Sequence, residues 1–301
     1  MTTRDAPSGP QALHPGINPG CPLCAGQGWR VEPLGEVAHA VWCSCVAVCP
    51  ICGGSGWTAS PGTAGRLAPQ RRCRCRALDD AIARFDRAQL PARHAGSTLV
   101  SFQPGRNMKA YTRIFGAVRG WQPAGSTAAP NRGLVLWGDV GRGKTHLLTA
   151  MLRELVFSRG LSARFVEFSH LLADLKSGFD RGTPAADLLD PLVEVDVLGI
   201  DELGKGRRTE FEETVIDEIV SRRYNAWRPV LATTNYRPKG VTGSATANLT
   251  DPERTAPSLG DRVGERVFSR LVEMCDFVEL EGEDFRSRIA AGDVRPPPRR
   301  R

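Results

Sequence analysis

The pattern of apolar and polar positions changes near residue 134, and the second half of the chain alternates between two kinds of segment. Short apolar runs typical of buried strands are separated by stretches in which apolar residues recur every three or four positions, as on one face of a helix. The strands are predicted at 134–137, 164–168, 195–200, 229–234 and 276–280, and the helices at 144–159, 169–177, 210–226 and 262–273. Strands that alternate with helices predict an α/β fold, with a parallel sheet covered on both faces.

The first half of the chain is organised differently. Helical spacing predicts amphipathic helices over 77–90, which Pro91 ends, and over 108–118. A stretch rich in Pro, Gly and Ser then forms a linker over 120–132. These boundaries divide the chain into a disordered N-terminus (1–20), a cysteine-rich module (21–76), linker helices (77–125), the α/β domain (126–288) and a disordered basic tail (289–301).

Composition and the lengths of apolar runs narrow the class of protein. Apolar residues make up 41% and charged residues 24% of the 301 residues, which is ordinary for a globular protein. No run approaches the roughly 18 apolar residues of a membrane span, and the first residues lack the apolar core of a secretory signal. These features predict a cytoplasmic protein with no membrane partner.

Eight of the nine cysteines form a duplicated motif. Each copy is a Cys-x-x-Cys-x-Gly-x-Gly-Trp segment followed farther along by Cys-x-Cys. Four thiolates per copy match a closed tetrahedral structural Zn²⁺ site, and segments this short rarely fold without a metal or disulfide. The predicted zinc ligands are Cys21, Cys24, Cys43, Cys45, Cys49, Cys52, Cys73 and Cys75. The ligand sets could form within or across the copies, and an iron–sulfur cluster is the alternative to two zinc ions.

Metal binding would also change the charge balance. The formal net charge is +7, and eight thiolates on two Zn²⁺ would reduce it to about +3. The second copy contains Trp57 and a run of arginines that is compatible with nucleic-acid binding. These arginines are Arg66, Arg71, Arg72, Arg74 and Arg76.

The segment Gly138-Asp-Val-Gly-Arg-Gly-Lys144-Thr145 is a complete phosphate-binding loop of the form G-x-x-x-x-G-K-[ST]. It follows an apolar strand and opens a helix, so that glycines let backbone N–H groups surround a polyphosphate at the helix N-terminus. Lys144 would reach the β- and γ-phosphates of ATP, and the Thr145 hydroxyl would bind Mg²⁺. The candidate ATP-binding residues of the loop are Gly138, Asp139, Val140, Gly141, Arg142, Gly143, Lys144, Thr145 and His146.

Two later strands end in polar residues that fit ATP hydrolysis. Asp201 and Glu202 follow one strand; Asp201 would hold Mg²⁺, and Glu202 would orient and polarise the attacking water. Asn235 follows the next strand, either as a loop cap or beside the γ-phosphate. Farther on, Arg266 and Arg270 lie one helical turn apart, either as solvated residues or as residues that enter the site of a neighbouring subunit.

Six segments together resemble the DnaC/DnaI/IstB group of AAA+ ATPases, the bacterial helicase loaders and transposition helpers. They are 138–146, 195–204, 216–223, 228–235, 259–270 and 284–288. The resemblance implies an AAA+ core with a five-stranded sheet in the order 5-1-4-3-2, no substantial helical lid and an ATP-dependent homo-oligomer. It also implies sensor 1 at Asn235 and an arginine finger at Arg270, with Arg266 as the alternative, and it raises Arg286 or Arg288 as a sensor-2 contact.

The resemblance further indicates where DNA and a partner would bind. In these loaders the helix after the second core strand lines a channel for single-stranded DNA, which here would use Lys176, Phe179 and Arg181. The alternative is an amphipathic helix that buries its leucines and leaves an ordinary polar rim. Some loaders carry one N-terminal zinc module that docks the helicase, and the cysteine motif is also similar to that of DnaJ chaperones.

Together these features predict an ATPase that loads or remodels a DnaB-type hexameric replicative helicase on single-stranded DNA. The first alternative is an IstB-like transposition helper that binds duplex DNA and a transposase. The second is a zinc adaptor whose nucleotide site changes conformation without useful turnover. The cysteine-rich arm favours the loader, because typical IstB proteins resemble this chain only over the ATPase part.

Overall fold

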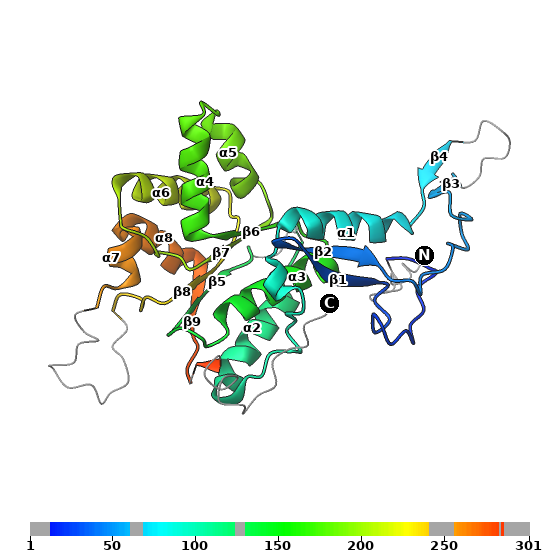
Figure 1. Ribbon diagram of the computed structural model, residues 1–301, viewed down its shortest axis with the longest axis horizontal. Coiled ribbons are helices and arrows are strands. Elements are labelled where there is room, and N and C mark those ends of the chain that lie inside the picture. The colour runs from blue at the N-terminus through cyan, green and yellow to red at the C-terminus, as the bar shows by residue number, and fades with distance from the viewer. Residues whose placement is uncertain (1–12, 61–68, 124–129, 241–255, 283, 286–301) are drawn as a thin grey trace. The chain divides into compact units, whose positions relative to one another are not determined.

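The computed structural model describes residues 13–60, 69–123, 130–240, 256–282 and 284–285, and the chain divides into two compact units (Figure 1). The first unit is Met1–Gly96 together with Val156–Gly160, and the second is Ser97–Leu155 together with Leu161–Arg301. The predicted basic tail, Arg66, Arg286 and Arg288 lie outside the described residues.

The first unit contains two antiparallel hairpins and a helix. In each cysteine-rich copy the segment between the two cysteine pairs forms a hairpin that the sequence analysis did not predict. The hairpins are β1 (Trp29–Leu34) with β2 (Val37–Trp42), and β3 (Trp57–Ala59) with β4 (Gln70–Arg72). Helix α1 (Arg76–Ala88) buries one apolar face, which confirms the amphipathic helix predicted there, and a 3₁₀ turn, η2 (Ala92–His94), follows it.

The prediction of a disordered N-terminus is wrong for residues 13–20. His14 and Ile17 are buried, and the N–H of Ala47 donates to the carbonyl of Gly16 over 2.9 Å. This segment therefore packs into the first cysteine-rich copy. Its composition gave no sign of this, because a single isoleucine among Pro and Gly residues carries no periodicity.

The second unit contains a five-stranded, all-parallel sheet, which confirms the predicted α/β class. Its strands are β5 (Gly133–Trp137), β6 (Ala163–Glu167), β7 (Val197–Asp201), β8 (Val230–Thr234) and β9 (Cys275–Glu279). The order β6-β7-β8-β5-β9 is the order 5-1-4-3-2 that the family resemblance implies, read from the other edge. Every residue of β5, β7 and β8 is buried, as expected for central strands covered on both faces.

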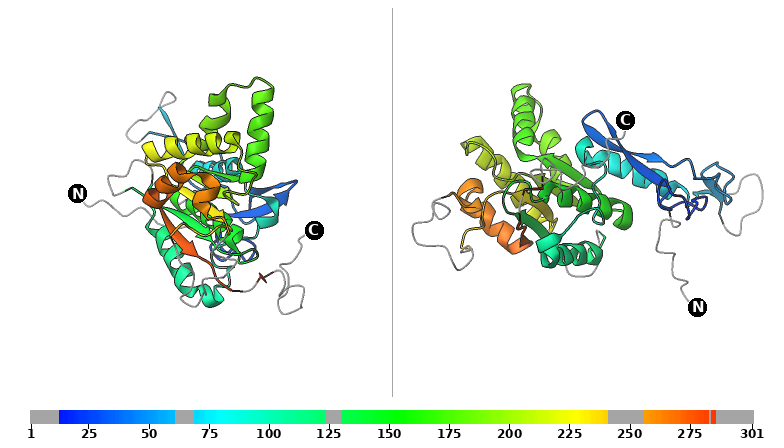
Figure 2. Two further views of the ribbon diagram at one scale, coloured as in Figure 1. Left: turned by 90° about the vertical axis from the view of Figure 1, so that its left-hand side faces the viewer. Right: turned by 60° about the horizontal axis from the view of Figure 1, so that its bottom comes forward.

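Helices cover both faces of this sheet. They are α2 (Met108–Gly120), α3 (Lys144–Arg159), α4 (Phe168–Asp180), α5 (Ala185–Val193), α6 (Glu210–Asn225), α7 (Leu259–Val263) and α8 (Glu265–Met274), with a 3₁₀ turn, η3 (Gly105–Asn107), before α2. Leu198 and Ile200 of β7 join one apolar cluster with residues of α4 to α8, whereas Gly199 between them faces Leu152 of α3. Figure 2 shows α4 and α2 on opposite sides of the sheet.

Two helical segments differ from the prediction. The helix predicted at 262–273 begins at Leu259 and is broken at Gly264, whose φ of 87° is a left-handed conformation that favours glycine. Helix α5 was not predicted, and it contains Pro191, a residue that argues against a helix interior in a sequence. Residues 286–301, where a helical lid after β9 would lie, are outside the described residues, so its expected absence stays a prediction. None of the helices in the described ranges combines the length and the apolar character that a membrane span requires.

One buried arginine binds the backbone at the N-terminal ends of the central strands β7 and β8. The Arg223 side chain is fully buried, and its guanidinium donates to five backbone carbonyls that precede β7 and β8. The acceptors are Leu192 (2.8 Å), Val193 (3.1 Å), Val195 (3.0 Å), Asp196 (3.2 Å) and Pro229 (2.7 Å). Burial lowers the pKa of Arg223 to about 9. The hydrogen bonds to these five carbonyls therefore offset the free-energy cost of burying the Arg223 cation. They also hold β7 and β8 beside each other.

Candidate active site and metal centres

The phosphate-binding loop has a backbone that only glycine can follow at its two ends. Gly138 has a φ of 137°, and a Cβ there would lie 2.3 Å from the carbonyl oxygen of Leu280. Gly143 has a φ of 81°, and a Cβ there would lie 2.8 Å from the ring of Phe102. Helix α3 starts at the next residue, so the loop ends at a helix N-terminus that favours an anion.

Lys144 is held inside this loop. Its Nζ donates to the carbonyls of Gly138 and Asp139, both over 2.6 Å. Burial, followed by the charge of Arg142, lowers the pKa of Lys144 to about 8. A buried ammonium with only carbonyl partners gains favourable energy from a phosphate, so the geometry fits the predicted contact with ATP.

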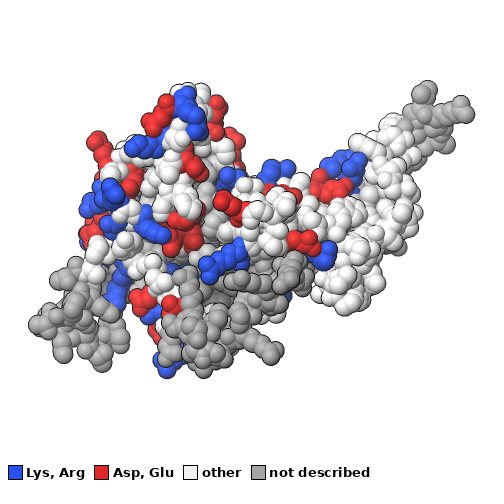
Figure 3. Space-filling view, in the orientation of Figure 1, with Lys and Arg blue, Asp and Glu red and all other residues white. Residues whose placement is uncertain are grey.

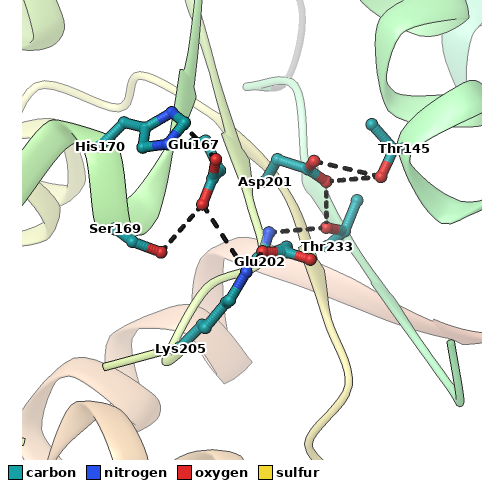
Figure 4. A network of polar contacts seen from close by, with 8 residues as sticks. All are labelled: Thr145, Glu167, Ser169, His170, Asp201, Glu202, Lys205 and Thr233. Carbon is teal, nitrogen blue, oxygen red and sulfur yellow. Dashed lines mark hydrogen bonds and ion pairs between the residues drawn. The ribbon is translucent and has the colours of Figure 1, made fainter. Parts of the chain in front are cut away.

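Asp201 lies at the centre of a polar network that joins three segments (Figure 4). Its carboxylate accepts from the Thr145 hydroxyl over 3.0 and 3.1 Å and from the Thr233 hydroxyl over 2.5 Å. Burial raises the pKa of the Asp201 carboxyl, against the effect of the two hydroxyls. Hydroxyl and carboxylate oxygens this close are the ligand types that Mg²⁺ prefers, so Thr145 and Asp201 could hold the ion.

Thr233 is a site residue that the sequence reasoning missed. Its hydroxyl donates to Asp201 and also accepts from the backbone N–H of Glu202 over 2.9 Å. It therefore holds Asp201 at the end of β7 and the backbone of Glu202 just after it, from the neighbouring strand. The sequence did contain a signal for this residue, namely two adjacent hydroxyl residues, Thr233 and Thr234, in the otherwise apolar strand β8.

Glu202 is partly exposed and has a positive φ of 55°, which is uncommon for a residue other than glycine. Its carboxylate pairs with Lys205, whose Nζ also lies 3.9 Å from the carboxylate of Glu167. Asn235 is exposed directly after β8. Because β7, β8 and β5 are neighbours, the structure brings the predicted loop, acids and asparagine to the same edge of the sheet.

Residues 126–291 match the protein family described as IstB-like ATP binding protein. This match spans more than half of the 301 residues. The chain belongs to this family. Membership in this ATP-binding family implies that the domain binds ATP and uses Mg²⁺.

The chain is also similar to individual proteins. The replicative helicase loader DnaC of Escherichia coli strain K12 is 33% identical over 153 residues, which cover 50% of this chain and 55% of that protein. DnaC of Buchnera aphidicola subsp. Baizongia pistaciae is 34% identical over 104 residues, which cover 33% and 42%. A crystal structure of the DnaC helicase loader matches with a TM-score of 0.52 at 27% identity and covers 63% of this chain and 99% of that chain. The chain spans about half the length of these curated relatives.

The two candidate finger arginines of this IstB-like domain share one partner. On α8, Arg270 pairs with Asp217 of α6 over 2.7 Å, and Arg266 approaches the same carboxylate at 3.7 Å. The Arg266 side chain is 76% exposed and that of Arg270 is 26% exposed. Asp217 thus supplies the anion that two neighbouring guanidinium groups need.

Helix α4 combines the two alternatives that its sequence left open. Lys176 and Arg181 are exposed, as a phosphate contact requires. Phe179 instead packs edge-on against Phe211 of α6, with ring centroids 6.1 Å apart, and joins the apolar cluster together with the buried leucines. Phe179 is only partly buried, so stacking of its ring on a base stays a prediction.

The cysteines gather into two separate groups, one in each copy, with the four sulfur atoms of each within 4.8 Å of one another. Cys21–Cys43 and Cys49–Cys73 are 3.8 Å apart, and Cys24–Cys45 and Cys52–Cys75 are 3.6 Å apart, measured between Sγ atoms. A tetrahedral site with Zn–S bonds of about 2.3 Å has S–S edges of about 3.8 Å. Both groups therefore fit Zn²⁺, and the ligand sets form within each copy.

Backbone amides in each copy favour the thiolate form. The N–H of Gly28 donates to Cys24 Sγ over 3.2 Å, and the N–H of Gly56 donates to Cys52 Sγ over 3.3 Å. A hydrogen bond from the Cys24 backbone lowers the pKa of Cys21 to about 7, whereas burial raises that of Cys45 to about 12. Four thiolates in this volume therefore need a cation, which is the role expected of zinc.

Elemental analysis of the purified protein is expected to find two zinc ions per chain. Cys24→Ser should retain one ion and increase amide hydrogen exchange over residues 21–45 alone, because each group draws all its ligands from one copy. Cys275→Ala is the matched control: this ninth cysteine is buried beside β8 and should leave both ions in place. Iron in place of zinc, or disturbance of both copies by Cys24→Ser, would contradict the assignment.

Proposed function

We propose that this protein is an ATP-dependent loader or remodeller of a DnaB-type replicative helicase, acting on single-stranded DNA. The observation that carries the proposal is the similarity of the ATP-binding half to curated proteins named replicative helicase loader. The IstB-like alternative, a transposition helper that acts with a transposase, would use the same ATP site. The loader is favoured because the two groups of four cysteines precede that site and offer a separate arm for a protein partner.

The proposed turnover assigns one task to each side chain at the edge of the sheet. Lys144 binds the β- and γ-phosphates, and Thr145 and Asp201 hold Mg²⁺, which when bound neutralises phosphate oxygens. Glu202 orients the attacking water and accepts its proton at the carboxylate. Thr233 keeps Glu202 in position through the backbone N–H. Asn235, exposed at the same edge, helps to hold the water beside the γ-phosphate.

Substitution of Glu202 tests this assignment. Glu202→Gln should bind ATP normally, because the hydrogen bond of its backbone N–H to Thr233 is unchanged, but should hydrolyse it at least roughly 10²-fold more slowly. Lys144→Ala should abolish ATP binding. Glu210→Gln on the exposed first turn of α6 is the control and should keep wild-type values. Single-turnover hydrolysis and equilibrium ATP binding are the measurements, and unchanged hydrolysis in Glu202→Gln would mean that another group holds the water.

The α8 arginines are proposed to complete the site of a neighbouring subunit in an ATP-dependent homo-oligomer. Arg270 is the first candidate and Arg266 the second. Their shared pairing with Asp217 supports this role, because the carboxylate holds the two guanidinium groups next to each other on α8, with Arg266 exposed and Arg270 partly exposed. A guanidinium supplied from another subunit stabilises charge on the transferring phosphoryl group. In other NTPases it increases the rate of hydrolysis about 10³–10⁵-fold.

Mixing two inactive variants tests the shared site. Arg270→Ala should bind ATP but lose hydrolysis, and Lys144→Ala should lose both. When the two are mixed, the Lys144→Ala subunit can lend its Arg270 to an intact phosphate loop, so hydrolysis should partly recover. The same series with Arg266→Ala identifies which arginine acts. No recovery for either pair, with subunit exchange verified, would show that both arginines are only surface residues.

The partner is tested by co-purification. Tagged protein with ATP should capture a DnaB-type helicase from its own cells, and Lys144→Ala should capture less, because the proposed interaction depends on ATP. Capture of a transposase without a helicase would replace the loader by the transposition helper. Tagged Glu210→Gln protein, which should bind ATP normally, is the matched control and should capture as much helicase as the wild type.

A further inference from the structure

The two cysteine-rich copies differ in how they use the tryptophan that follows the first cysteine pair. Trp29 in the first copy is 5% exposed and stacks on Phe157, with ring centroids 3.5 Å apart. Trp57 occupies the equivalent position in the second copy and is 46% exposed. One tryptophan is therefore part of the core of the first unit, and the other leaves an indole face on the surface.

The copies also differ in charge. From Cys49 to Arg76 the sequence contains five arginines and no acid, so a tetrathiolate zinc site leaves about +3. From Cys21 to Val46 it contains one arginine and two glutamates, which leaves about −3. The arginines of the second copy occupy the positions of apolar or small residues in the first. In order, Arg71, Arg72, Arg74 and Arg76 correspond to Val41, Trp42, Ser44 and Val46.

Two of these arginines have acidic partners and two do not. Arg72, opposite Trp57 in the hairpin, pairs with Asp80 over 3.0 Å, and Arg76 pairs with Asp79 over 3.5 Å. Figure 3 shows basic and acidic side chains side by side on this part of the first unit. Arg71 and Arg74 are exposed, and among the described residues no carboxylate pairs with either of them. Arg71 stands opposite Thr58, on the other face of the hairpin from Trp57, and Arg74 lies two residues beyond β4. Positive charge without an acidic partner and an exposed indole therefore belong to the same copy.

We propose that the second cysteine-rich copy binds single-stranded nucleic acid, with Trp57 stacked on a base and Arg71 and Arg74 in contact with phosphates. Aromatic side chains next to cationic groups are the common means of binding single strands without sequence preference. This surface belongs to the first unit and the ATP site to the second, and the proposal does not depend on the proposed loader function.

The test uses full-length, zinc-loaded protein without nucleotide and measures fluorescence anisotropy of a labelled oligothymidine at several salt concentrations. Arg71→Ser/Arg74→Ser should weaken binding at least about tenfold and reduce the slope of log affinity against log salt by about 1.4, or about 0.7 for each lost phosphate contact. Trp57→Ala should weaken binding about tenfold, and Trp57→Phe should restore most of it, because phenylalanine still stacks.

The matched control removes the same charge elsewhere. Arg106→Ser/Lys109→Ser changes two exposed residues near the start of α2 and should leave affinity and salt slope unchanged. Zinc is measured in every variant. Unchanged affinity and slope in the Arg71/Arg74 variant with zinc intact would overturn the proposal. The proposal would also be overturned if the Arg71/Arg74 variant kept its affinity for DNA but no longer captured a helicase. The second cysteine-rich copy would then bind an acidic protein instead of nucleic acid. Failure of the wild type to capture a helicase would contradict the proposed loader function, but it would not affect the measurement of DNA binding.

Discussion

The buried carboxylate of Asp201 is the interaction on which the ATP site depends. Burial of a carboxylate is costly unless hydrogen bonds or a cation compensate, and here the compensation comes from Thr145 at the start of α3 and Thr233 on β8. The phosphate loop, the acidic strand and the next strand are therefore held together by one group. Thr233 extends the network to the backbone of Glu202, so the proposed base shares the same support. A Mg²⁺ ion beside Thr145 would complete the compensation.

The cysteine-rich copies meet a different constraint. Each is too short to bury a core, so four metal–sulfur bonds would replace packing as the source of stability. A metal that holds the turn in both copies would leave the following tryptophan unnecessary for folding in each of them. In the first copy Trp29 packs on Phe157, and in the second Trp57 stays exposed. The duplicated motif thus stabilises two similar units while leaving one surface available for another role.

The sequence predicted those parts of the structure whose signal is local or periodic. The phosphate loop requires glycines at fixed positions, and the central strands are continuous apolar runs, so both could be located, and the family resemblance supplied the strand order. Features that depend on tertiary contacts could not be predicted. Helix α5 tolerates Pro191 because it packs against α4 and α6, residues 13–20 fold because Ile17 is buried, and Thr233 acts only because β7 lies next to it.

Two buried charges of opposite sign act at opposite ends of β7 and β8. At the N-terminal end, Arg223 donates to carbonyls that precede both strands. At the C-terminal end, Asp201 accepts a hydrogen bond from Thr233. A slip of one residue between these strands would turn side chains to the other face and break both sets of hydrogen bonds. Register is therefore fixed at each end by a group whose isolation in the core would be costly. This double constraint explains how a short parallel pair can hold the carboxylate of Asp201 and the backbone of Glu202 in place at one end of the sheet.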